Sequence, residues 1–238
     1  MSSQNFDLVV FGASGETGTH VLNQAVDRGL TVLGLDHTVP DRAEDDGAVH
    51  RQVDVLEDDL TEHLKGHPRV VSALGLGFSP AAMTDPPPLY SKGTANIVAA
   101  MTETGASRLC VISAAFVEKD ERLPAWFRAS VIPALSAILE EMREMEDQLE
   151  NSRLDWTAVR PGWLLEKPRS GSYEVQDRRL PADVFRTRNA DLAHFLLDAA
   201  LTDDWVRAKP SLGRTENAFD ESPAALSREV AAMVGIEL

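Results

Sequence analysis

Short apolar runs alternate with helical patterns along the whole chain. The run Leu8–Phe11 is apolar throughout and stops at Gly12, as expected for a strand that is buried on both faces. Apolar residues then recur at helical spacing until Gly29, which ends the helix. The same pattern predicts further strands at 31–35, 49–53, 69–74, 109–112 and 156–159.

Helical patterns separate these predicted strands, at about 56–64, 89–104 and 131–149. In the last of these helices, four acids are expected to face water: Glu140, Glu141, Glu144 and Asp147. A regular alternation of strand and helix implies parallel strands joined by right-handed crossovers. The sequence therefore predicts an α/β fold with a doubly wound (Rossmann), mostly parallel sheet and helices on both faces.

Charge and cysteine content restrict the partners and the compartment. The chain has 38 acidic and 23 basic residues, a formal net charge of -15, which would repel nucleic acids and anionic membranes. Cys110 is the one cysteine, so no internal disulfide can form and a reducing compartment is favoured. We find no targeting segment and expect a cytoplasmic protein.

The turn after the first strand has the glycine spacing of a dinucleotide site. Gly12-Ala13-Ser14-Gly15-Glu16-Thr17-Gly18 follows a buried strand and opens a helix. A pyrophosphate needs this geometry, because glycines permit the tight turn and the helix N-terminus offers amide donors. Ser14 and Thr17 can add hydroxyl donors. We therefore predict cofactor contacts from Gly12, Ser14, Gly15, Glu16 and Thr17.

An acid ends the second predicted strand. Asp36 lies about 20 residues after Gly15, the spacing expected for a carboxylate that binds the hydroxyls of the adenosine ribose. Its neighbours are mostly acidic, with His37 and Arg42 among them: Asp41, Glu44, Asp45 and Asp46. We predict cofactor contacts from Asp36 and His37. A 2′-phosphate would be repelled there, so NAD is favoured. NADP is not excluded, because Arg42 is able to act as a phosphate clamp.

An ordered set of motifs resembles the short-chain dehydrogenase/reductase superfamily in its atypical and extended branches. The sequence is most similar to the NmrA-like and biliverdin-reductase-B-like NAD(P)H-binding proteins, and the resemblance covers nearly the whole chain. The matching pieces, in chain order, are Gly12-x-x-Gly15-x-x-Gly18, Asp54-Val55, Ser72-Ala73-Leu74-Gly75, Val111-Ile112-Ser113, Asp155–Gly162 and Asn189–Ala193.

The resemblance implies further cofactor contacts, position by position. Asp54 and Val55 would contact the adenine, and Leu74 and Gly75 the adenosine ribose. The residues that would line the nicotinamide are Ser113, Pro161, Gly162 and Trp163. No linker or shift in composition marks a second domain, so we expect a single NAD(P)-binding Rossmann domain over residues 1–238, with a small C-terminal region on the substrate side.

One departure from the family concerns proton transfer. Classical members carry a Tyr-x-x-x-Lys pair after the serine, and the usual spacing from Ser113 falls on Trp126 and Ser130. We take Ser113, Tyr90 and Trp126 as the candidate catalytic residues. Arg128, a water molecule and the substrate itself remain alternatives as the source of the proton or of electrostatic stabilisation.

Three irregular segments are expected on the substrate side: 76–88, 114–130 and 163–186. They contain most of the aromatic residues of interest, which either pack in the core or line an apolar substrate pocket. These residues are Phe78, Phe116, Trp126, Phe127, Trp163 and Phe185.

Two other patterns have simpler interpretations. His63 and His67 are four residues apart, but Gly66 and Pro68 would break a helix there, so we expect solvated histidines and no metal site. The apolar stripe from Val131 to Leu149 fits either a homodimer seam or a helix face packed on its own sheet. The oligomeric state stays open.

The leading hypothesis is an NAD(P)-dependent oxidoreductase acting on a small or medium apolar carbonyl or quinone-like substrate. The nicotinamide would be presented toward Ser113, Trp126 and Trp163. A non-catalytic redox sensor or regulator and a cofactor-retaining epimerase or isomerase are the alternatives.

Overall fold

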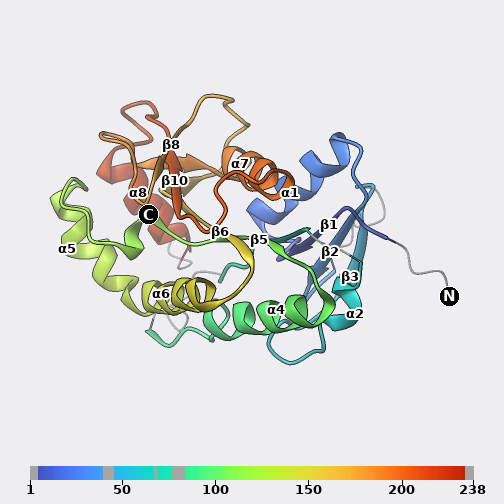
Figure 1. The fold of residues 1–238 in the computed structure, drawn as a ribbon. Coiled ribbons are helices and arrows are strands. Elements are labelled where there is room, and N and C mark those ends of the chain that lie inside the picture. Colours follow the sequence, from blue (N-terminus) through green and yellow to red (C-terminus); the bar gives the residue numbers. More distant parts are fainter. Residues whose placement is uncertain (1–4, 40–45, 67–68, 77–83, 234–238) are drawn as a thin grey trace.

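A central parallel sheet organises the chain. The computed structural model describes residues 5–39, 46–66, 69–76 and 84–233. An eight-stranded sheet has the order β3-β2-β1-β4-β5-β6-β10-β8, with all neighbours parallel except β8, which is antiparallel to β10 (Figure 1). Its strands are β1 (Leu8–Phe11), β2 (Val32–Asp36), β3 (Val49–Gln52), β4 (Arg69–Ser72), β5 (Arg108–Ile112), β6 (Asp155–Pro161), β8 (Glu174–Asp177) and β10 (Pro210–Gly213). A separate parallel pair joins β7 (Trp163–Leu165) and β9 (Arg186–Arg188).

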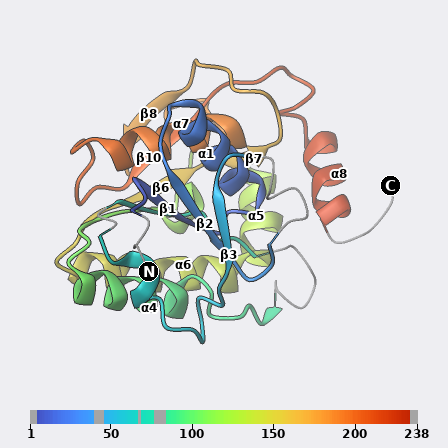
Figure 2. The same cartoon turned by 90° about the vertical axis from the view of Figure 1, so that its right-hand side faces the viewer.

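Helices cover both faces of this sheet. Figure 2 shows α1 (Glu16–Asp27) and α7 (Asn189–Leu201) on one face. The helices α4 (Ser91–Thr104) and α6 (Ser136–Asn151) lie on the other face. The remaining helical elements are α2 (Thr61–Leu64), a short 3₁₀ helix η1 (Ala115–Val117), α5 (Ala125–Ala134) and α8 (Pro223–Met233). The predicted doubly wound fold with helices on both faces is confirmed.

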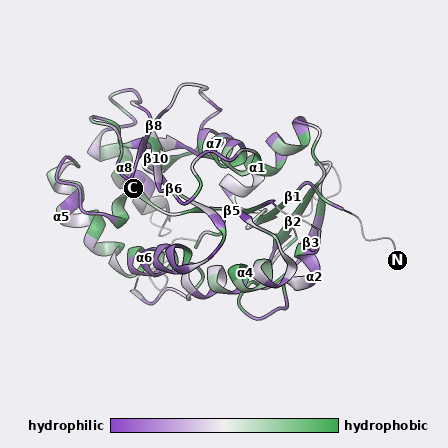
Figure 3. Cartoon of the chain, in the orientation of Figure 1, coloured by the Kyte–Doolittle hydropathy of each residue, from purple (hydrophilic) through white to green (hydrophobic). Residues whose placement is uncertain are grey.

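Side chains of the central strands alternate between two apolar layers. In β1, Val9 and Phe11 pack in the layer that contains α4 and α6, whereas Leu8 and Val10 pack in the layer that contains α1 and α7. Both layers are buried, which explains why the strand sequences are continuously apolar. In Figure 3 the central strands are accordingly hydrophobic, while the helices alternate between hydrophobic and hydrophilic surfaces.

The helix predicted over 131–149 is two helices. α5 ends at Ala134 and α6 starts at Ser136, with Pro133 in the last turn of α5. Proline lacks an amide hydrogen and crowds the preceding turn, which favours a break at this point. Trp126 and Phe127 therefore lie on a helix, where the sequence suggested a loop. The apolar stripe of α6 faces its own core: Ile138, Leu139, Met142, Met145 and Leu149 are buried.

The segment 163–186 is also more regular than expected. It contains β7 and β8, and β8 pairs with β10 to complete one edge of the main sheet. Neither β8 nor β10 follows from the apolar pattern, because β8 has one apolar residue and β10 begins with a proline and ends with a glycine. Sheet pairing, which joins segments far apart in the chain, decides their conformation.

The structure also describes the environments of two side chains considered in the sequence, His63 and Cys110. His63 was expected in solvent, but it is 8% exposed and lies 3.3 Å from Arg51, so that prediction was wrong. The packing of α2 buries its ring, which lowers its pKa, and His67 lies outside the described residues. Cys110 is fully buried in β5, and burial raises the pKa of its thiol to about 11. In the ranges described, no helix has the length and apolar character needed to cross a membrane.

Candidate functional site

The glycine-rich turn lies where the sheet changes direction. β1 sits between β2 and β4, and the turn that follows β1 is pressed against the residues that follow β4 (Figure 1). Gly12 has a φ of +71°, and a Cβ there would lie 2.5 Å from the Ala73 carbonyl oxygen. A Cβ on Gly18 would lie 2.0 Å from the Gly12 carbonyl oxygen. Both glycines are therefore required for the fold itself, because no side chain fits at either position.

Gly15 has a different environment. It precedes α1 as its N-cap in extended conformation, and no side chain caps the helix there. A Cβ on Gly15 would have only ordinary contact, 3.4 Å from the Gly12 carbonyl oxygen, and Ser14, Gly15 and Glu16 are exposed. The first amides of a helix have no partner within the helix, and its dipole favours negative charge. The turn thus presents an open helix N-terminus that fits a pyrophosphate.

Side chains near this turn already have protein partners. The Ser14 hydroxyl donates to Asp36 at 2.7 Å, and the Thr17 hydroxyl donates to Asn189 Oδ1 at 3.0 Å. Asn189, at the start of α7, also donates to the Glu16 carboxylate at 3.0 Å. Both hydroxyls are thus bound within the protein in this structure, and their contacts with a cofactor stay a prediction. The Gly15 amide donates to the Gly12 carbonyl, so the amides at the start of α1 are the donors that remain for an anion.

Asp36 ends β2 beside this turn. Its carboxylate accepts hydrogen bonds from the Ser14 amide at 3.0 Å and from the His37 amide at 2.8 Å. Burial alone would raise the pKa of Asp36, but the hydrogen bonds from Ser14 and His37 outweigh it and the pKa is lowered. The group is thus an anionic acceptor at the position expected for a ribose contact. Several neighbours used to favour NAD lie outside the described residues: Asp41, Arg42, Glu44 and Asp45.

The residues that follow β3 and β4 include two apolar side chains, Val55 and Leu74, that lie against α4. Val55 is buried, and both Val55 and Leu74 would contact a Cβ placed on Gly93 of α4, at 3.3 and 3.5 Å. Asp54 is exposed and forms the turn that follows β3, where its side chain accepts from the Leu56 amide. Gly75 is exposed, and its Cβ position has no heavy atom within 4 Å. The predicted adenine and ribose residues thus follow the carboxyl ends of β3 and β4, two strands of the same sheet with β2 and β1 between them.

Ser113, which directly follows β5, is held in a buried ionic cluster. Its hydroxyl donates to Glu146 Oε1 of α6 at 2.6 Å, and both residues are 2% exposed. Arg160 of β6 donates to the same carboxylate at 2.8 Å, and Lys209 Nζ lies 2.9 Å from it. Because a carboxylate can only accept, the Ser113 proton points at Glu146.

The charges of this cluster stabilise one another. Burial would raise the pKa of Glu146, but the hydrogen bond and charge of Arg160, with Ser113 and Lys209, lower it. Arg160 also donates to Glu118 at 2.7 Å, and the pKa of Glu118 is lowered by Arg160 and Arg178. Sequence reasoning missed Glu146 and Lys209 and gave Arg160 no role. A signal existed, since Glu146 falls on the buried stripe of α6, four residues after Met142.

The two tyrosines are poorly placed to act as acids. Tyr90 is 6% exposed, its hydroxyl accepts from the Leu76 amide at 3.3 Å, and burial raises its pKa. Tyr173 packs in the layer of α1 and α7, where its hydroxyl lies 2.9 Å from His194 Nδ1. Burial, with the charge of Asp198, raises the pKa of Tyr173 to about 12.

Five of the six predicted aromatic residues form one cluster, and Phe78 lies outside the described residues. Phe127 is at its centre, with ring centroids of Phe116 and Phe185 at 4.9 Å, Trp163 at 5.6 Å and Trp126 at 5.7 Å. Phe127 is fully buried, whereas Trp126 is half-buried. The cluster is therefore partly core, with Trp126 at its more open side.

The residues that end β6 support this cluster. Pro161 is the last residue of β6, and Trp163 is buried and donates its indole N–H to Glu229 of α8 at 2.9 Å. A Cβ on Gly162 would lie 2.3 Å from the Phe185 carbonyl oxygen, so this glycine permits a close approach of backbones. Gly162 and Trp163 thus fix the segment after β6 against Phe185 and α8.

Comparison with known proteins gives the family. The model of a family described as NAD(P)H-binding matches residues 12–203, most of the chain and all of the glycine-rich turn. The chain belongs to this NAD(P)H-binding family. This agrees with the resemblance to atypical short-chain dehydrogenases/reductases, and it gives a nicotinamide dinucleotide as the cofactor without distinguishing NAD from NADP.

Solved structures share the fold at low sequence identity. An oxidoreductase from Lactococcus lactis is 16% identical with a TM-score of 0.70, covering 93% of this chain and 97% of its own. A protein described as a candidate NADH-flavin reductase from Streptococcus pneumoniae is 20% identical with a TM-score of 0.70, covering 89% and 100%. A wide-type short-chain dehydrogenase/reductase from Veillonella parvula, in complex with NADP, is 15% identical with a TM-score of 0.70, covering 92% and 99%.

Proposed function

We propose that the protein is an atypical short-chain reductase that uses NAD(P)H and passes a hydride to a quinone or flavin. A two-electron acceptor of this kind forms a stabilised anion that takes its proton from water. A ketone, by contrast, needs an acid close to its oxygen. The acceptor class is therefore set by whether the protein offers a proton at the site.

The hydrogen bond from Ser113 to Glu146 carries this proposal. It directs the serine O–H at Glu146 and not at a substrate, and the lowered pKa of Glu146 keeps this carboxylate ionised. Tyr90 is almost fully buried and burial raises its pKa, which makes it a weaker acid, while the Trp126 indole is not an acid. None of the three candidate catalytic residues is thus arranged to donate a proton. Ser113 is better suited to accept a hydrogen bond.

Each part of the chain has a role in this proposal. A reduced nicotinamide, when bound, supplies the hydride. The amides at the start of α1 bind the pyrophosphate, Asp36 binds the adenosine ribose, and Val55 and Leu74 pack against the adenosine. Trp126 and Trp163 provide an apolar wall that excludes water and orients a flat acceptor. The solved neighbour described as a candidate NADH-flavin reductase is consistent with such an acceptor.

Stopped-flow assays with NADH and NADPH against a quinone, a flavin and a ketone would test the acceptor class. We expect cofactor oxidation with the quinone or the flavin and none with the ketone. Reduction of the ketone would contradict the proposal, because it requires a proton donor that we have not assigned. Binding of cofactor without oxidation by any acceptor would instead favour the redox-sensor alternative.

The variant Asp36→Ala should weaken NADH binding more than NADPH binding. The carboxylate can accept from the two ribose hydroxyls of NADH, whereas it repels a 2′-phosphate, so we expect about a tenfold larger loss for NADH. Calorimetric titration of both cofactors measures this ratio. Ser14→Ala is the matched control, because it removes the 2.7 Å contact to Asp36 and keeps the carboxylate. An equal loss for the two cofactors in Asp36→Ala would refute the preference for NAD.

A further inference from the structure

A carboxylate of the C-terminal helix α8 reaches the small sheet formed by β7 and β9. The helix lies beyond residue 203, where the match to the NAD(P)H-binding family ends, and Figure 2 shows it at the edge of the molecule. Trp163 and Arg186 are opposite each other in the register of β7 and β9. Glu229 of α8 contacts both side chains, so one carboxylate joins the two strands to the helix.

Arg186 fixes the Glu229 carboxylate. Its Nη1 donates to Glu229 Oε2 at 3.0 Å, and its Nη2 donates to Glu229 Oε1 at 2.8 Å. A two-point contact of this kind sets the orientation of a carboxylate as well as its place. Arg186 is 0% exposed and a guanidinium stays charged, so it needs this partner in the folded protein. Glu229 is therefore held by a buried group, although α8 itself is peripheral.

Glu229 in turn fixes the plane of the Trp163 indole. The indole N–H donates to Glu229 Oε2 at 2.9 Å. The ring also meets Phe127 edge-on, with a centroid distance of 5.6 Å and an interplanar angle of 86°. An indole has one donor, so a fixed acceptor for that donor together with the ring contact selects one orientation. Without Glu229 the ring would keep its apolar contacts but lose the contact that sets its plane.

The same face of α8 packs against the aromatic residues. Leu226, three residues before Glu229, is 1% exposed and belongs to the same apolar layer as Trp163. Arg228, by contrast, is exposed. Positions three residues apart share a helix face, so α8 directs Leu226 and Glu229 inward together. The helix is thus attached to the substrate side by one apolar and one charged side chain.

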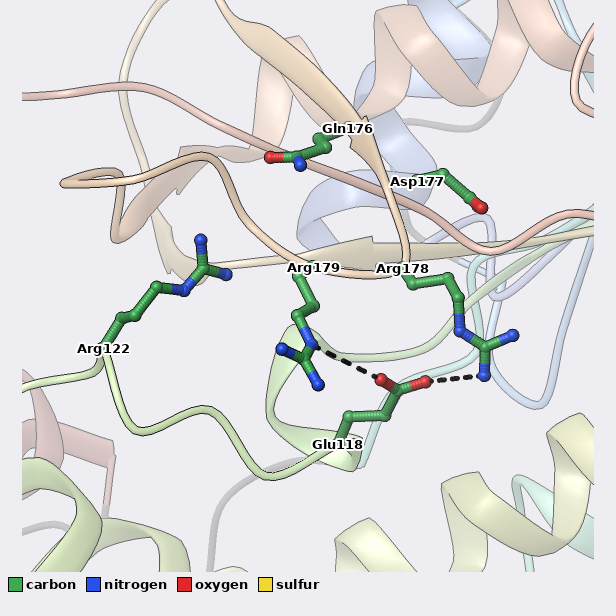
Figure 4. Close-up of a pocket in the computed structure, with 6 residues that line it drawn as sticks. All are labelled: Glu118, Arg122, Gln176, Asp177, Arg178 and Arg179. Atoms are coloured by element: carbon green, nitrogen blue, oxygen red, sulfur yellow. Dashed lines mark hydrogen bonds and ion pairs between the residues drawn. The ribbon is translucent and has the colours of Figure 1, made fainter.

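A cavity beside β8 has a different character. It has a volume of about 500 Å³ and is lined by Glu118, Arg122, Gln176, Asp177, Arg178 and Arg179 (Figure 4). Glu118 pairs there with Arg178 and Arg179. None of the residues that line this cavity is aromatic, so a flat apolar acceptor fits the aromatic cluster better.

We propose that Glu229 is a positioning residue for the acceptor: it holds the Trp163 indole in the plane against which a flat quinone or flavin lies. The inference rests on the proposed function, which gives Trp163 this place in the wall. Glu229 acts through the indole and does not touch the acceptor. When the ring is free to turn, a bound acceptor takes several orientations, and few of them suit hydride transfer. The glycine-rich turn and Asp36 are not part of this chain of contacts, so cofactor affinity should not depend on Glu229.

A double-mutant cycle tests this role. Glu229→Leu removes the acceptor of the indole N–H and keeps a side chain of similar size, whereas Trp163→Phe removes the N–H and leaves the pair of Arg186 and Glu229 in place. Steady-state assays give kcat and KM for a quinone and a flavin, and calorimetry gives the Kd of NADH. Arg228→Leu is the matched control, because it introduces the same side chain on the exposed face of α8. The ¹H–¹⁵N signal of the Trp163 indole, identified by its loss in Trp163→Phe, reports the hydrogen bond directly.

We expect Glu229→Leu to move the indole signal and to lower kcat for the acceptor about tenfold, with the Kd of NADH unchanged within about twofold. Since Glu229 acts through the indole, adding Glu229→Leu to Trp163→Phe should lower kcat little further. Arg228→Leu should leave the indole signal, kcat and the Kd of NADH unchanged. If Glu229→Leu does not fold, Trp163→Phe alone decides: a lower kcat at unchanged NADH affinity supports the proposal, and an unchanged kcat overturns it.

The outcomes separate this proposal from the proposed function. An unchanged kcat in Glu229→Leu, an equal loss of NADH affinity, or fully additive effects in the double variant would overturn the role of Glu229 while the wild type still oxidises NADH with a quinone or a flavin. A wild-type protein without turnover would instead defeat the proposed function, and the role of Glu229 with it.

Discussion

Gly15→Val should abolish NAD(P)H binding while the protein stays folded. The Cβ position of Gly15 has only the Gly12 carbonyl oxygen as a contact, at 3.4 Å, so the side chain projects into the space that the pyrophosphate would occupy. Losing two amide hydrogen bonds to a charged phosphate, at about 1.5–3 kcal/mol each, weakens binding about 100-fold or more. Calorimetric titration with NADH and NADPH measures the loss.

Gly18→Ala provides the contrast for this experiment. A Cβ there overlaps the Gly12 carbonyl oxygen at 2.0 Å, so this variant should lose stability as well as cofactor binding. Gly15→Val changes a helix N-cap, which costs about 1 kcal/mol or less. Unfolding curves of both variants separate the two effects. Unchanged affinity in Gly15→Val would show that the dinucleotide does not bind at this turn.

Glu146→Gln should produce the largest loss of stability among single isosteric changes in this cluster. The substitution leaves Arg160 and Lys209, both nearly fully buried, without their shared carboxylate. Removing one partner of a buried ion pair costs about 3–5 kcal/mol. Glu118 and Glu150, which still pair with Arg160 and Lys209, compensate the two cations only in part, because both carboxylates are more exposed than Glu146. We expect the melting temperature to fall by about 10 °C in a chain of this size.

Glu144→Gln is the matched control for Glu146→Gln. Glu144 lies on the same helix but is exposed, so its change should alter the free energy of unfolding by about 0.5 kcal/mol or less. Chemical denaturation of both variants measures the difference. If the two variants were equally stable, the Glu146 cluster would not contribute to the fold as described.

The sequence predicts best those parts of the fold whose conformation is determined by residues close to one another in the chain. β1 is apolar at every position because both its faces are buried, and Gly12 and Gly18 stand where no side chain fits. β8 and β10 follow a different rule, since each is short and mixed in polarity and forms a strand only because it pairs with a distant segment. Such pairing leaves no periodic signal in either segment alone.

The candidate site shows the same division. The turn and Asp36 come from a local motif, and the structure brings Ser14 and Asp36 into contact. The ionic cluster around Ser113 draws on α6, β6 and the residue before β10, which no local pattern joins. A charged residue inside an apolar pattern, such as Glu146 on α6 or Arg160 in β6, still marks a group that needs a buried partner of opposite charge.

The position of Cys110 makes the protein convenient for spectroscopy. It is the sole cysteine, it sits in the middle of β5, and its thiol stays protonated at neutral pH. Maleimide reagents attack thiolates, so the native protein should remain unlabelled. A cysteine introduced at a chosen exposed position then becomes the sole attachment point for a fluorophore or spin label, with no need to remove the natural one first.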